Sequence, residues 1–127
     1  MGRSRVTYLL NSVILIDHFI GVEAATAFLS EHGSECAISV ITHAEVLTGF
    51  DARRIALARA LLDTFAHLPI TAEIADLAAS LRRRRHWKLP DALQAAIAIQ
   101  HDLTLVTRNT RDFKRGGKPD VLVPWRI

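Results

Sequence analysis

The sequence contains one cysteine and no long apolar run, and both absences narrow the classes of protein to consider. Cys36 is the only cysteine among 127 residues, so an intramolecular disulfide is excluded and we expect a buried, inert thiol in a strand. No apolar run approaches the roughly 20 residues that span a bilayer. The basic N-terminal residues are followed by no small-residue cleavage site, which argues against a signal peptide. We therefore expect a cytoplasmic protein.

Nucleotide-cofactor and zinc motifs are also missing. No glycine-rich loop follows the first predicted strand, residues 6–10, so binding of a nucleotide cofactor finds no support. His18, His32, His67 and His101 lack the spacing of zinc ligands, which disfavours a zinc site. We find no repeat and no linker. A chain of 127 residues, half of them hydrophobic, predicts a single domain over residues 1–127.

Strand-like and helix-like segments alternate along the chain. Short apolar runs predict strands at residues 6–10, 35–39, 103–107 and 121–123, with a brief extended piece at 67–70. Apolar residues at helical spacing predict helices over residues 12–19, 23–32, 42–50, 53–65, 71–85 and 90–101. In the fourth helix, Leu57, Leu61 and Phe65 are expected to face inward, with Ala58 and Leu62 on the flank. This alternation predicts an α/β domain with a central parallel sheet covered by helices on both faces.

The net charge is +3, and the basic residues gather in two blocks, at residues 82–88 and 108–118. Basic blocks suit a polyanion such as nucleic acid, because binding to phosphates releases counterions. An arginine-rich helix end can equally be a solvated surface that complements the helix dipole. For the first block alone the two interpretations are even. The second block follows a strand end beside the polar residues described next, which favours nucleic acid. We expect Arg82, Arg85 and Arg111 to contact it.

Polar residues follow three of the predicted strands. They are Asn11 and Ser12 after residues 6–10, Thr42 and Glu45 after 35–39, and Arg108, Asn109 and Asp112 after 103–107. The carboxyl ends of parallel strands share one edge of a sheet, so we expect these groups to converge. Asp91 joins them if the helix that Pro90 opens begins at the same edge.

Each of these polar residues also has a structural explanation. Thr42-x-x-Glu45 has the form of a capping box, Asn109-x-x-Asp112 can cap a single turn, Asp91 lies in a first helical turn, and Asn11 is a plausible N-cap. Taken together they indicate more, because clustered carboxylates repel each other and a divalent cation relieves the repulsion. Mg²⁺ and Mn²⁺ prefer oxygen ligands and promote attack of water on phosphodiesters. The pattern favours a metal-dependent nuclease over four unrelated caps.

The chain resembles PIN domains, and more narrowly VapC-type toxin ribonucleases of toxin–antitoxin pairs. The resemblance is carried by four segments, Tyr8-Leu-Leu-Asn-Ser-Val-Ile-Leu-Ile-Asp17, Ile38-Ser-Val-Ile-Thr-His-Ala-Glu-Val-Leu-Thr-Gly49, Leu89-Pro-Asp-Ala-Leu-Gln-Ala-Ala-Ile-Ala98 and Leu105-Val-Thr-Arg-Asn-Thr-Arg-Asp-Phe113. It implies a three-layer α/β/α fold, a Mg²⁺- or Mn²⁺-dependent endoribonuclease, a homodimer, and an antitoxin that blocks the site. The antitoxin would lie on apolar surface of the helices over residues 12–30 and 42–65.

The same resemblance assigns the site residues. Glu45, Asp91 and Asp112 match the family's metal-binding, catalytic acids, and Thr107 and Asn109 match its polar strand-end residues. Ser12 and Arg108 stand beside them and are expected to help position the substrate.

Residue 11 departs from the family, whose first acid is aspartate where this chain has Asn11. An amide oxygen can bind a metal but carries no negative charge, so we expect a weakened enzyme. Natural degeneration and deliberate replacement by a near-isostere both explain the change, and we favour the second. The competing hypothesis is a PIN-fold module that binds nucleic acid or a partner without chemistry. A phosphatase or sugar-binding α/β protein is a distant third.

Overall fold

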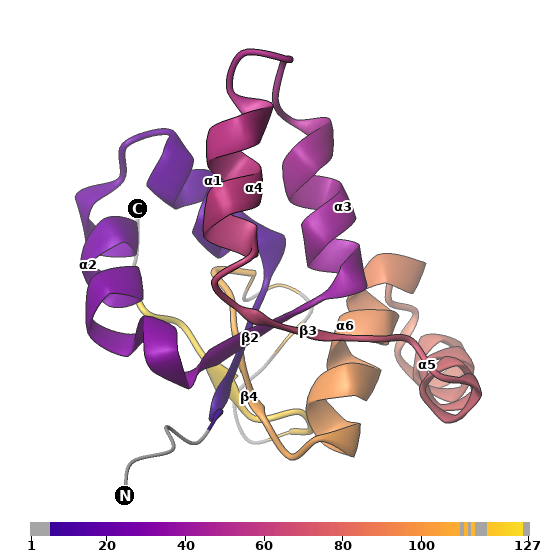
Figure 1. The fold of residues 1–127 in the computed structure, drawn as a ribbon. Coiled ribbons are helices and arrows are strands. Elements are labelled where there is room, and N and C mark those ends of the chain that lie inside the picture. The colour runs from indigo at the N-terminus through magenta and orange to yellow at the C-terminus, as the bar shows by residue number, and fades with distance from the viewer. Residues whose placement is uncertain (1–5, 110, 112, 114–116, 126–127) are drawn as a thin grey trace, which may run out of the picture.

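The protein is built on one sheet of five parallel strands. The structure, a computed structural model, describes residues 6–109, 111, 113 and 117–125. The strands lie in the order β3-β2-β1-β4-β5, and every neighbouring pair is parallel (Figure 1). They span β1 Tyr8–Leu10, β2 Cys36–Ser39, β3 Ala66–Leu68, β4 Thr104–Val106 and β5 Val121–Leu122. The predicted parallel α/β architecture is therefore confirmed.

Helices cover both faces of this sheet, which makes three layers. They span α1 Ser12–Phe19, α2 Glu23–His32, α3 Val40–Thr48, α4 Ile55–Leu62, α5 Ala72–Arg85 and α6 Leu89–Gln100, with a 3-10 turn at Gly33–Glu35. Helices α1 to α4 pack on one face, and α5 and α6 on the other (Figure 1). No single helix of the described residues is long and apolar enough to cross a membrane; only α1 together with the segment Glu23–Glu35, bent by 118°, reaches that length and hydropathy.

Two adjacent residues of β1 show how the sheet separates the two hydrophobic cores. Leu9 packs with Leu105 in the core under α5 and α6, whereas Leu10 packs with Val106 in the core under α1, α3 and α4. The register pairs Leu9 with Leu105 and Leu10 with Val106, so each pair points to one face. Strands buried on both faces explain why these apolar runs are continuous rather than alternating.

The structure corrects two local predictions and refines a third. Helix α3 begins at Val40 instead of residue 42, because the Ser39 hydroxyl caps it by accepting a hydrogen bond from the Thr42 amide at 3.1 Å. Helix α4 buries Ala58 and Leu62, while Leu57 is 69% exposed. Of the predicted inward residues, Phe65 and Leu61 do pack in this core, whereas Ala58 takes the place expected for its neighbour Leu57. The extended piece near residue 67 is the edge strand β3.

Cys36 is expected to resist thiol reagents until the protein unfolds. Burial raises the pKa of this thiol to about 12, and Sγ donates a hydrogen bond to the His32 carbonyl at 3.2 Å. The folded state thus favours the neutral thiol, a contribution to stability that is complete below the unfolded pKa of about 8.5 and is lost as the pH rises toward 12. Labelling with a disulfide reagent at pH 8 should be slow in buffer and fast in denaturant. Equal rates would show that Cys36 is accessible.

Candidate active site

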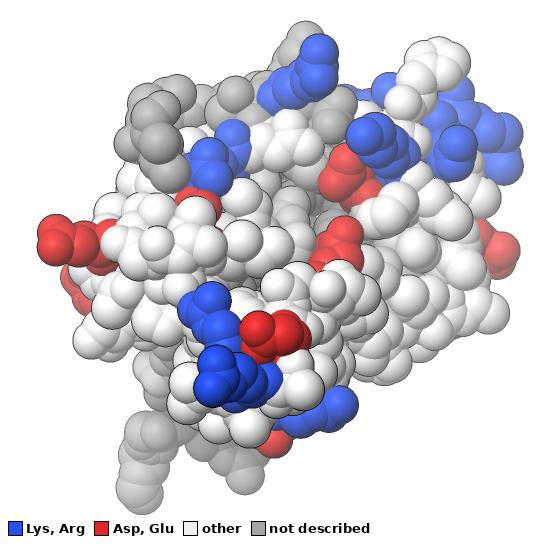
Figure 2. Space-filling view, turned by 90° about the horizontal axis from the view of Figure 1, so that it is seen from above, with Lys and Arg blue, Asp and Glu red and all other residues white. Residues whose placement is uncertain are grey.

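Residues from four separate segments line one pocket at the carboxyl edge of the sheet. Asn11 directly follows β1, Glu45 lies on α3 after β2, Asp91 lies in the first turn of α6, and Thr107 follows β4. The pocket has a volume of about 290 Å³ and is lined by Asn11, Ser12, Val13, Glu45, Asp91, Thr107, Arg108 and Asn109. Figure 2 views this end of the molecule and shows acidic side chains in and beside a central hollow. The central position of β1, between β2 and β4, brings these segments together.

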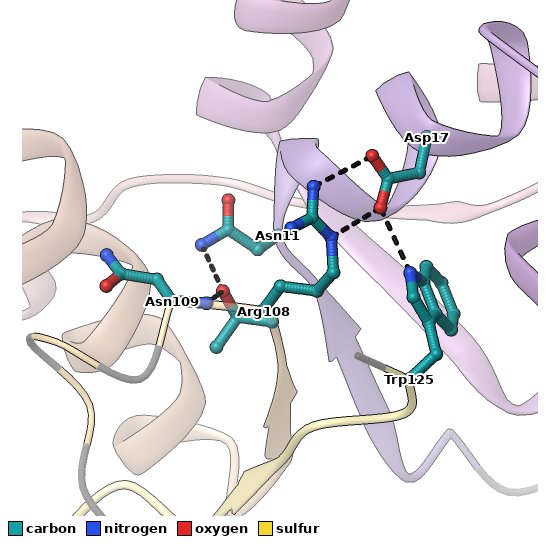
Figure 3. A network of polar contacts seen from close by, with 6 residues as sticks. Asn11, Asp17, Arg108, Asn109 and Trp125 are labelled. Carbon is teal, nitrogen blue, oxygen red and sulfur yellow. Dashed lines mark hydrogen bonds and ion pairs between the residues drawn. The ribbon is translucent and has the colours of Figure 1, made fainter. Parts of the chain in front are cut away.

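Hydrogen bonds hold the polar residues that follow β1 and β4. The Asn11 amide donates to the Thr107 hydroxyl at 3.2 Å, and that hydroxyl also accepts from the Asn109 backbone N–H at 3.0 Å (Figure 3). Ser12 donates to the Asn11 Oδ1 at 3.3 Å. Thr107 and Asn11 are both buried. Thr107 therefore organises the pocket wall by joining the ends of two neighbouring strands.

The donor set of the pocket suits a hard cation. Glu45 and Asp91 supply carboxylate oxygens and Asn11 an amide oxygen, which are the ligand types that Mg²⁺ and Mn²⁺ take. No group of three or more His, Cys, Asp or Glu side chains with metal-binding geometry occurs among the described residues. Residue 11 is an amide and does not belong to these four residue types. Asp112, the remaining predicted acid, lies outside the described residues.

The structure agrees with the helix-terminus explanation for Asp91 and not with those for Asn11 and Glu45. Thr42 lies inside α3, where Ser39 is the cap, so a capping box of Thr42 and Glu45 is wrong. Asn11 occupies the N-cap position of α1, but its side chain makes no capping hydrogen bond and turns to Thr107 instead. Asp91 does lie in the first turn of α6. For Asn11 and Glu45, helix capping no longer explains the residue.

A buried chain of hydrogen bonds connects three of the segments that line the pocket. Gln94 Nε2 donates to the Thr42 hydroxyl at 2.6 Å, and that hydroxyl donates to the Leu10 carbonyl at 3.2 Å. Thr42 is one turn before Glu45, Gln94 is one turn after Asp91, and Leu10 precedes Asn11. Gln94 Oε1 is buried and has no hydrogen-bond partner among the described residues. These hydrogen bonds therefore link the segments that carry Asn11, Glu45 and Asp91. The sequence prediction missed this connection.

Arg108 lines the pocket, but its positive charge is paired with a carboxylate on α1. Its guanidinium forms a two-point ion pair with Asp17 on α1, which is only 2% exposed. The hydrogen bonds to Asp17 raise the pKa of Arg108 above its ordinary value. Sequence analysis did not place Asp17 at the site. Its spacing of three residues from the buried Ile14 was the signal that this acid lies on the inward face of α1.

The predicted RNA-contacting arginines lie outside the pocket. Arg82 and Arg85 are exposed in the last turn of α5, and Arg111 is exposed as well. Figure 2 shows a group of basic side chains on the side of this face where α5 lies in Figure 1. Trp87 is buried, packs against Phe113, and lies under the Arg85 guanidinium at 5.3 Å. It is therefore a packing residue rather than an exposed platform for bases.

Comparison with known proteins identifies the family. The PIN domain family matches residues 8–119. The chain belongs to the PIN-domain family. Ribonuclease VapC19 of Mycobacterium tuberculosis is 32% identical to this PIN domain over 125 residues, which cover 92% of this chain and 98% of the relative. The expected resemblance to VapC-type proteins is thereby confirmed.

Solved structures agree with this assignment. A toxin–antitoxin complex from Klebsiella pneumoniae contains a chain that is 39% identical, with a TM-score of 0.84 over 95% of this PIN domain and 100% of that chain. FitAcB from Neisseria gonorrhoeae has a TM-score of 0.79 at 24% identity over 95% of this chain and 100% of that chain, which shows the shared fold. Each of these two matches covers 95% of this chain.

Proposed function

We propose that this PIN domain is a metal-dependent endoribonuclease toxin of the VapC type, weakened by Asn11 at its first acidic position. The observation that carries the proposal is the convergence of Asn11, Glu45 and Asp91 from distant segments on one pocket of about 290 Å³. The relative VapC19 is named a ribonuclease, which supports the proposed reaction. The similar chain from Klebsiella pneumoniae belongs to a toxin–antitoxin complex, which supports an antitoxin partner. The substrate is RNA.

In this proposal Glu45, Asp91, Asp112 and the Asn11 oxygen would hold Mg²⁺ or Mn²⁺. Such an ion supplies positive charge that activates a water molecule and stabilises charge developing on the phosphate. The protein's own groups orient the reaction: Thr107 holds Asn11 and the Asn109 backbone in place, and Ser12 bonds to the Asn11 oxygen. Arg82, Arg85 and Arg111 would contact the RNA outside the pocket, where their charges attract phosphates over a longer range.

An antitoxin surface is part of the proposal. Ile20 at the end of α1 is 70% exposed, and Leu57 on α4 is 69% exposed. Val40 at the start of α3 is exposed too. Large exposed apolar side chains on one layer of helices provide surface that a partner protein can cover. These helices are the ones on which we expect the antitoxin from the resemblance to VapC proteins, and a homodimer is expected by the same analogy.

RNA cleavage by the purified protein is expected to need Mn²⁺ or Mg²⁺, to stop with EDTA, and to be lost in the Glu45→Gln variant. The matched control is Asp76→Asn, which removes an exposed acid of α5 that does not line the pocket. It should leave the rate unchanged. Cleavage that persists in EDTA or in Glu45→Gln would contradict the metal-site proposal.

A second candidate function is an RNA- or partner-binding module without chemistry. Asn11 favours it, because the amide lowers the negative charge of the pocket. The two candidates differ in the Asn11→Asp variant. RNA binding without metal-dependent cleavage in that variant would support the binding module.

A further inference from the structure

A three-residue network extends from the pocket wall into the core beneath α1. Arg108 Nε donates to Asp17 Oδ2 at 2.5 Å, and Arg108 Nη2 donates to Asp17 Oδ1 at 2.9 Å. Trp125 Nε1 donates to Asp17 Oδ2 at 3.1 Å (Figure 3). One buried carboxylate thus receives three N–H groups. Residues separated by 91 and 108 positions in the sequence meet at Asp17.

This arrangement fixes the plane of the Arg108 guanidinium. A guanidinium carries five N–H hydrogens, and the two-point contact with a carboxylate uses two of them along one edge. Arg108 lines the pocket together with Asn11, and Figure 3 shows the guanidinium between Asp17 and Asn11. The edge that bonds to Asp17 faces the protein interior, which leaves the other edge for the pocket.

We propose that Asp17 is a positioning residue that holds Arg108 with one guanidinium edge turned toward a phosphate of RNA in the pocket. The identity of the ligand rests on the proposed function. A free arginine side chain loses rotamer freedom when it binds, whereas Arg108 has already lost it in the folded protein. A fixed guanidinium also matches two phosphate oxygens at once. Asp17 therefore assists RNA binding through Arg108 and does not touch the RNA.

For the Asp17→Asn variant, the proposal predicts a change in RNA affinity opposite to the one expected from net charge alone. Asp17→Asn removes a negative charge near the site, so long-range electrostatics predicts tighter binding of a polyanion. We expect weaker binding instead, by about tenfold, because the neutral amide no longer holds the guanidinium by two charged hydrogen bonds. Arg108→Gln is expected to lose a similar factor.

The experiment measures binding of the full chain to a fluorescent single-stranded RNA in EDTA, where cleavage does not contribute. The variants are Asp17→Asn, Arg108→Gln, their combination, and Arg108→Lys, which keeps the positive charge beside Asp17 but loses the planar fork. We expect Arg108→Lys to bind more weakly than the unmodified protein, and the double variant to bind no more weakly than Arg108→Gln. Circular dichroism at the assay temperature verifies that each variant is folded.

Trp125→Phe is the matched control, because it removes the third donor to Asp17 and leaves the Arg108 pair intact. It should lower stability and keep RNA affinity within about twofold. Unchanged or tighter binding by Asp17→Asn, or additive losses in the double variant, would overturn the positioning role while leaving the nuclease proposal intact. No RNA binding by the unmodified protein would overturn both.

Discussion

Replacing Asn11 with aspartate is expected to raise metal-dependent RNA cleavage by about 100-fold, the scale of one lost electrostatic contact at a transition state. The substitution restores a negative charge to the pocket that Asn11 shares with Glu45 and Asp91. A hard cation is held largely by the charge of its oxygen ligands, so each added carboxylate strengthens the site. The variant should also become toxic to a bacterial expression host.

Aspartate fits the hydrogen bonds around residue 11 without rearrangement. Thr107 Oγ1 now accepts from both the Asn11 amide and the Asn109 backbone N–H. With aspartate, the Thr107 hydroxyl would donate its own proton to the carboxylate and still accept from Asn109. Ser12 would keep an acceptor at the same oxygen. The gain in activity therefore needs no change in the hydrogen bonds around residue 11.

The measurement is the cleavage rate of a structured RNA with Mn²⁺ and with EDTA, for the unmodified protein, Asn11→Asp, and Asn11→Asp combined with Asp91→Asn. The second substitution should abolish the gain, because both residues would serve one ion. Asn11→Ser is the matched control, since it alters the side chain without adding charge. No gain in the aspartate variant, or a gain insensitive to EDTA, would contradict the proposed metal site.

The fold and the position of the candidate site were predictable because they depend on rules of topology. Strands alternating with helices require parallel pairing, and parallel pairing puts Asn11, Glu45 and Thr107 at one edge whatever the details of packing. The position of Asp91 could be predicted because Pro90 marks the start of a helix. These inferences need the order of the elements and no precise side-chain geometry.

Contacts between distant side chains were not predictable in the same way. The inward face of α4 could not be read from its apolar pattern, because Leu57 and Ala58 are adjacent and only packing decides which one is buried. Asp17 meets Arg108 across 91 residues of sequence, and the periodicity that places Asp17 on the inward face of α1 does not reveal this partner. The cap of α3 shifted to Ser39, because the serine hydroxyl reaches the Thr42 amide where β2 ends.

The Thr42→Val substitution is expected to lower the free energy of unfolding by about 3 kcal/mol, since it leaves buried hydrogen-bonding groups without a partner. The Thr42 hydroxyl accepts from Gln94 at 2.6 Å and donates to the Leu10 carbonyl at 3.2 Å. Valine keeps the shape of threonine but can do neither. Urea unfolding of the two proteins measures the difference. Thr104→Val on β4 is the control, because the Thr104 side chain has no hydrogen bond among the described residues, and it should change stability by less than about 0.5 kcal/mol.

A second substitution tests whether lost hydrogen bonds cause the loss of stability in Thr42→Val. Gln94→Met alone should change stability by no more than about 1 kcal/mol, because it removes a buried Oε1 that has no partner among the described residues along with the donor to Thr42. Combined with Thr42→Val, it should recover about half of the loss, since no buried amide of residue 94 then lacks a partner. Additive losses in the double variant would show that packing, and not the hydrogen-bonded chain, makes Thr42 important. Recovery of stability would support the view that Gln94 and Thr42 tie together the strand and the two helices that carry Asn11, Glu45 and Asp91.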